Sequence, residues 1–156
     1  MLSDMSTTRI RQHVRAPRAK VYAAIIDAES VATWMVPDGM TSLVHAFDAR
    51  PGGTFRVSLT YDAPTGTGKS SARTDTYHGR FVELVPGERV VQTMEFETRD
   101  PRMQGEMKTT FELVDADGGT EVIGTHEHVP PGVKPSDNEL GWKMALSKLA
   151  ALVERR

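Results

Sequence analysis

The hydrophobic positions follow two different periods along the chain. Residues 136–154 place apolar side chains at helical spacing, which predicts one long helix with a single apolar face. Pro135 precedes this stretch and Ser136 with Glu139 fits a capping box, so we expect the helix to begin there. A helix of this length with one apolar face requires a large apolar partner surface. Its stripe consists of Trp142, Ala145, Leu146, Leu149, Leu152 and Val153.

Most of the remaining chain has the period of two that is typical of strands. The clearest strand covers residues 55–61, where Phe55, Val57 and Leu59 alternate with polar residues. The same pattern predicts strands at residues 8–14, 43–47, 77–85, 90–96, 106–114 and 120–128, and helices at 16–27 and 30–34. Consecutive strands joined by short turns form an antiparallel meander. A sheet of six or seven such strands curls, and only the final helix is long enough to cover its concave face. We therefore expect an α+β fold.

Composition narrows the classes of partner. The 156 residues suffice for one domain, which we expect at 8–156 after a flexible tail at 1–7. The net charge of −2 gives no electrostatic reason to expect nucleic acid or an anionic membrane. The chain has no cysteine, which excludes disulfides, thiolate metal sites and cysteine nucleophiles. We find neither an apolar run of the ~20 residues that a membrane span needs nor the order of a signal peptide, and expect a cytoplasmic protein.

Two histidines raise the question of a metal. His126 and His128 lie two apart on a predicted strand, so both rings would face the same side, as a zinc site requires. Glu127 faces the other way and no second spaced pair exists, so we expect no metal and no required cofactor. His126 is instead interpreted as a polar group at the cavity mouth or bonded to the backbone. Which face of this strand points inward stays open, because Val122 and Ile123 are both apolar.

The other candidate motifs do not indicate a catalytic or nucleotide-binding site. The segment 66–70 resembles a phosphate loop, but the required first glycine is Ala63 and no helix should follow, so we expect no nucleotide site. Asp48 and Arg50 are expected to share an ion pair that fixes the turn at 51–53. Asn138 either bonds a ligand or caps the final helix. No spacing forces an acid–base or nucleophilic pair together, so the residues themselves do not indicate an enzyme.

Several short motifs together carry a resemblance that extends over residues 10–153. They are Ala16-Pro17-Arg18-Ala19 with Val21-Tyr22, Trp34, Pro37 with Gly39-Met40, Phe47-Asp48 with Arg50 and Gly52-Gly53, Gly79-Arg80-Phe81, Gly119-Thr120-Glu121-Val122, and His126-Glu127 with Asn138-Glu139 and Gly141-Trp142. With them the sequence resembles the START-like (helix-grip, SRPBCC) superfamily. Within it, the chain is similar to stand-alone bacterial proteins related to the activator of the heat-shock protein 90 ATPase.

The resemblance implies a cavity between the curved sheet and the final helix that holds a small apolar molecule. We therefore expect binding of a small hydrophobic or amphipathic molecule whose identity the sequence leaves open. The positions expected to line the cavity are Trp34, Phe55, Val57, Tyr77, Phe81, Met94, Phe96, Met107, Thr109, Phe111, His126, Trp142, Ala145, Leu146 and Leu149.

Two other functions use the same fold. The first is an enzyme of the cyclase, dehydratase or hydrolase type, in which a His, Tyr or Glu in the cavity acts as general base. The second is a co-chaperone-like interaction domain in the stress response. The known activators carry an additional N-terminal domain for which this chain has no room, so the sequence does not support a chaperone partner. Whether the protein forms a homodimer stays open.

Overall fold

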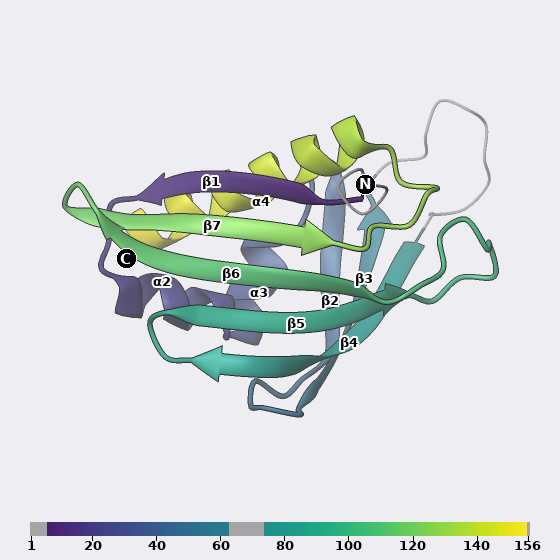
Figure 1. Ribbon diagram of the computed structural model, residues 1–156, viewed down its shortest axis with the longest axis horizontal. Helices are drawn as coiled ribbons and strands as arrows, with labels where there is room; N and C mark the ends of the chain where they lie inside the picture. The colour runs from purple at the N-terminus through teal and green to yellow at the C-terminus, as the bar shows by residue number, and fades with distance from the viewer. Residues whose placement is uncertain (1–5, 63–73, 156) are drawn as a thin grey trace.

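The computed structural model describes residues 6–62 and 74–155, and these residues form one antiparallel sheet of seven strands with three helices (Figure 1). The elements in chain order are β1 (Thr8–Val14), α2 (Arg18–Ile25), α3 (Ala28–Trp34), β2 (Met40–Phe47), β3 (Thr54–Tyr61), β4 (Thr74–Val85), β5 (Arg89–Phe96), β6 (Met107–Ala116), β7 (Gly119–Glu127) and α4 (Pro135–Glu154).

The strand order across the sheet is β1-β7-β6-β5-β4-β3-β2. The chain therefore crosses from one edge to the other through α2 and α3, and the meander from β2 to β7 returns it to β1. Helix α4 then runs along the sheet beside β1 (Figure 1) and packs against β1, α2 and α3. The expected helix-grip fold is confirmed.

The long helix starts differently from our expectation. It begins at Pro135, with Lys134 as N-cap and no hydrogen bond from a capping side chain. Proline suits the first helical position because its fixed φ is helical and its missing N–H would have no partner there. The capping box predicted from Ser136 and Glu139 is wrong, since Ser136 already lies in the first turn.

Helix α4 is buried unevenly along its length. Its buried side chains all lie in the C-terminal half, and they are Ala145, Leu146, Ala150, Leu149 and Val153. Gly124 of β7 faces this half of the helix, where a Cβ would lie in ordinary van der Waals contact with Leu146 Cδ1, at 3.5 Å. The N-terminal half of α4 has no fully buried residue, although Asn138 and Trp142 contact the sheet through hydrogen bonds.

Aromatic side chains fill the closed end of the core. Trp34 is fully buried and packs edge-on against Phe111, with 5.9 Å between ring centroids. Its indole Nε1 donates to the Ala24 carbonyl oxygen at 3.0 Å, which ties α3 to α2. The donor of this indole is thus satisfied within the core.

The turn before β3 has the structure expected from its sequence. Arg50 Nε lies 2.8 Å from Asp48 Oδ2 in an exposed ion pair. A Cβ at Gly53 would come within 1.9 Å of the Asp48 carbonyl oxygen, so only glycine fits there. The pair therefore belongs to the turn and not to a functional site.

Two segments considered in the sequence lie wholly or partly outside the described residues. The phosphate-loop-like segment 66–70 lies outside the described residues, as do residues 1–5 of the expected tail. Ser6, which belongs to the same expected tail, is described, and its carbonyl oxygen accepts a hydrogen bond from Val129 N at 3.0 Å.

No helix in the described part of the chain combines the length and apolarity that crossing a membrane requires.

Candidate ligand-binding cavity

A cavity of about 340 Å³ lies between the N-terminal half of α4 and one end of the sheet. We call it the helix–sheet cavity. At this end of the sheet, which we call the open end, β3, β5 and β7 finish and β2, β4 and β6 begin. Its lining is mainly apolar, with two carboxylates and, among the lining residues described, no lysine or arginine. The lining residues are Met35, Val36, Pro37, Met40, Leu59, Tyr61, Asp75, Tyr77, Met94, Phe96, Met107, His126, Val133, Asp137, Asn138, Gly141, Trp142 and Ala145.

Small residues on α4 create the space. A Cβ built on Gly141 would meet no atom within 4 Å, although the residue lies within the helix. Ala145 follows one turn later on the same wall of the cavity. The helix thus presents glycine and alanine where larger side chains would fill the space.

The segment after α3 closes one side of the cavity and is held by α4. Lys148 Nζ donates to the Val36 carbonyl oxygen at 2.7 Å and lies 3.0 Å from Asp38 Oδ1. These two contacts hold the backbone next to Met35 and Pro37 close to the helix.

His126 is the central polar group of the wall formed by β7. Trp142 Nε1 and the amide nitrogen of Asn138 both donate to His126 Nδ1, each at 3.1 Å. Because Nδ1 accepts, the proton of the neutral ring resides on Nε2, which faces Met107 Sδ at 3.2 Å. Burial lowers the pKa of His126 to about 4. The imidazole is therefore neutral at physiological pH.

Tyr77 of β4 is the second polar group that faces the interior. It is buried, and burial raises the pKa of its hydroxyl, so the group stays protonated. Its ring packs edge-on against Phe55 at 6.2 Å. Its side chain lines the helix–sheet cavity.

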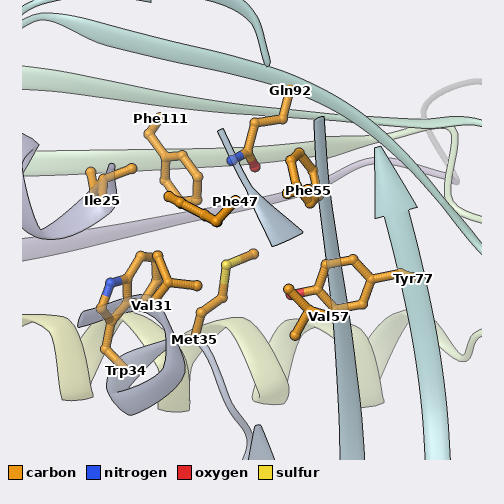
Figure 2. Close-up of a pocket in the computed structure, with 10 residues that line it drawn as sticks. All are labelled: Ile25, Val31, Trp34, Met35, Phe47, Phe55, Val57, Tyr77, Gln92 and Phe111. Atoms are coloured by element: carbon orange, nitrogen blue, oxygen red, sulfur yellow. The ribbon is translucent and has the colours of Figure 1, made fainter. Parts of the chain in front are cut away.

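A second, much smaller void lies deeper in the core. Its volume is about 10 Å³ and Met35 and Tyr77 line both it and the helix–sheet cavity. Figure 2 shows the Gln92 amide turned toward the middle of the surrounding side chains. The residues around this inner void are Ile25, Val31, Trp34, Met35, Phe47, Phe55, Val57, Tyr77, Gln92 and Phe111.

Comparison with known proteins identifies the family. Residues 15–154 match the family model described as Activator of Hsp90 ATPase homolog 1-like protein. The chain belongs to this family. No curated protein gives a significant match.

Solved structures share the fold over nearly the whole chain. Protein CV1439 from Chromobacterium violaceum is 34% identical with a TM-score of 0.83, and the match covers 95% of this chain and 97% of that one. A protein from Rhodobacter sphaeroides is 21% identical with a TM-score of 0.79, covering 97% and 93% of the two chains. DynU16, from the dynemicin biosynthetic locus, is 21% identical with a TM-score of 0.67, and the match covers 96% of this chain but 47% of DynU16.

The positions expected to line the cavity fall into three groups in this family member. Those in the helix–sheet cavity are Tyr77, Met94, Phe96, Met107, His126, Trp142 and Ala145. Those at the inner void alone are Trp34, Phe55, Val57 and Phe111. Those in the surrounding core, outside both linings, are Phe81, Thr109, Leu146 and Leu149.

The remaining histidines are placed away from the cavity. Strand β7 ends at Glu127 and His128 has a φ of 60°, so the expectation that His126 and His128 face the same side is wrong. His45 Nε2 lies 2.8 Å from the Ser58 hydroxyl, and neither residue lines the cavity. Within residues 6–62 and 74–155, no three His, Asp or Glu side chains are grouped to hold a metal ion.

Sequence reasoning missed the loop after α3, Leu59 and Tyr61 of β3, Asp75 of β4, Val133, and Asp137 and Gly141 of α4. The residues after α3, from Met35 to Met40, escaped it because a loop has no hydrophobic period. Gly141 carried a signal, since a glycine inside a helical stripe needs a packing or functional reason. The inward face of β7, left open before, is the one that carries His126 and Gly124.

Proposed function

We propose that the protein binds a small hydrophobic or amphipathic molecule in the helix–sheet cavity. The main support is the size of this cavity: its volume of about 340 Å³ lies in the range of ligand sites. The cavity is lined mainly by apolar and aromatic side chains. Met35, Met40, Met94 and Met107 all contribute to the lining. Methionine side chains are flexible and polarizable, so they adapt to ligands of varied shape.

The polar part of the lining disfavours an anionic ligand. Asp75 and Asp137 are the charged residues among the lining residues described, and both would repel a carboxylate. His126 does not supply a compensating cation, because its pKa of about 4 keeps the imidazole neutral. A fatty-acid carboxylate would therefore lack a partner here, whereas a neutral molecule would not.

The same groups favour binding over catalysis. His126 Nδ1 is already occupied by two donors and its Nε2 faces Met107. Burial raises the pKa of Tyr77, so its hydroxyl stays protonated near neutral pH and cannot take up a proton as a general base. In the described part of the chain neither group bonds a carboxylate. The enzyme alternative would need a proton-transfer group that these two side chains do not offer.

Substitutions of Gly141 test the proposal. A Cβ at position 141 would meet no atom within 4 Å, so Gly141→Phe directs a ring toward the cavity, and Gly141→Ala is the matched control that leaves most of the space open. The uncharged dye N-phenyl-1-naphthylamine, whose fluorescence rises in apolar surroundings, should bind wild type and Gly141→Ala saturably. It should not bind Gly141→Phe, whose fold is checked by circular dichroism. Equal binding by wild type and a folded Gly141→Phe would exclude the helix–sheet cavity as the site.

A further inference from the structure

Gln92 is a polar side chain at an inward position of β5. It lies between Val90 and Met94, which are both buried, and it is itself only 4% exposed. Its Oε1 is buried and has no hydrogen-bond partner among the described residues. A buried acceptor without a donor costs free energy, and a bound molecule that supplies the donor removes this cost.

The amide is directed into the inner void (Figure 2). Apart from Gln92, the polar groups around this void are the Trp34 indole and the Tyr77 hydroxyl. The indole N–H is already donated to Ala24. The volume of about 10 Å³ corresponds to about one water molecule. A hydroxyl group placed in this void would supply the donor that Gln92 Oε1 lacks.

The inner void and the helix–sheet cavity have Met35 and Tyr77 in common. Met35 is half-buried and unbranched, so a change of rotamer can join the two spaces at little cost. A ligand in the outer cavity is thus separated from Gln92 by one adaptable side chain and one aromatic ring.

We propose that Gln92 recognises the polar end of the cavity ligand, and that this end is an uncharged hydroxyl group, as in an alcohol or a phenol. The ligand enters with its hydroxyl first, donates it to Gln92 Oε1 and keeps its apolar part against the methionines of the helix–sheet cavity. An ammonium group is disfavoured at this end, because none of the described residues that line the inner void carries a charged side chain to compensate it. This inference rests on the proposed binding function.

A matched pair of probes tests the assignment. The first is 4-pentylphenol, and the second is its methyl ether, which has lost the hydrogen-bond donor and is larger by one methyl group at the same end. Each displaces N-phenyl-1-naphthylamine from wild type, and the phenol should bind roughly 3- to 10-fold more tightly, as expected for one hydrogen bond to a buried acceptor.

Two variants assign the preference to Gln92. Gln92→Leu removes the acceptor at similar volume and should bind both probes alike, with the ether bound at least as well as by wild type. Thr109→Val is the matched control: Thr109 is the cross-strand partner of Gln92, its hydroxyl is also buried and without a partner among the described residues, and it lies outside both linings. Thr109→Val should keep the wild-type preference.

The outcomes separate this inference from the proposed function. If the dye and both probes bind wild type but without a preference for the phenol, the role of Gln92 is overturned and cavity binding stands. A preference that survives in Gln92→Leu overturns the role of Gln92 in the same way. Failure of the dye and of both probes to bind wild type overturns the cavity function, and this inference with it.

Discussion

At the scale of single residues, His126 links three elements at the cavity wall. Its ring lies on β7 and accepts hydrogen bonds from Trp142 and Asn138 of α4. The Asn138 amide also donates to the Thr8 hydroxyl of β1 at 2.9 Å. A buried network of this kind fixes the start of the helix against the sheet, provided that the imidazole stays neutral.

The neutrality of His126 predicts a pH dependence of stability. Its pKa is about 4 in the folded protein and 6.5 in the unfolded chain, so the unfolded state takes up the proton first as the pH falls. The free energy of unfolding should be unaffected by this group above pH 6.5. It should decrease by about 1.4 kcal/mol per pH unit below that value, and by about 3 kcal/mol in total near pH 4.

Urea unfolding between pH 7.5 and 4 measures this effect, with His126→Gln as the control that cannot titrate. Carboxylates contribute at low pH in both proteins, among them Glu97, whose pKa is lowered to about 2 by its hydrogen bonds to Arg56 and His78. The difference between the two proteins isolates His126. Parallel pH profiles would show that the imidazole is not held neutral by the fold.

At the scale of elements, α4 combines a packed half with an open half. Gly141 lies in the open half, one turn before Ala145 and two turns before Leu149 on the same face. Glycine lowers helix stability, and the absence of any atom within 4 Å of its missing Cβ means that packing does not require it. The space in front of it is consistent with a functional reason for this residue.

Gly141→Ala should therefore raise the free energy of unfolding by about 1 kcal/mol, the difference in helix propensity between the two residues. The reverse change, Ala151→Gly at an exposed position of the same helix, should lower it by a similar amount. Thermal or urea unfolding of both variants checks the pair. Destabilisation by Gly141→Ala would mean that the Cβ meets the sheet and that the cavity is closed.

Periodicity predicted the elements well, because it reports which face of a helix or strand is apolar. It does not report whether the space in front of that face is filled. Phe81 and Met94 both point inward, but Phe81 is packed in the core whereas Met94 lines the cavity. Gln92 lies on the same face of β5 as Val90 and Met94. A polar residue at an apolar position of a strand indicates a candidate binding group, and the prediction of the site did not use this signal. His128 was misplaced because a strand end depends on the following turn.

At the scale of the whole molecule, stability and binding are assigned to opposite ends of one helix–sheet interface. The closed end is packed around Trp34, Phe111 and Leu146, which are fully buried. The open end keeps a cavity of about 340 Å³. A ligand that fills it should stabilise the folded state by about 2.7 kcal/mol at a free concentration of 100 times Kd.

The central claim is that the helix–sheet cavity holds a small molecule, and native mass spectrometry of the protein purified from the cells that naturally make it tests this directly. The account predicts that the folded wild-type protein carries an additional mass of a small molecule, which is released on unfolding and is absent from Gly141→Phe produced in the same cells. A folded wild-type protein with only the mass of its chain, or an additional mass that Gly141→Phe retains, would contradict it.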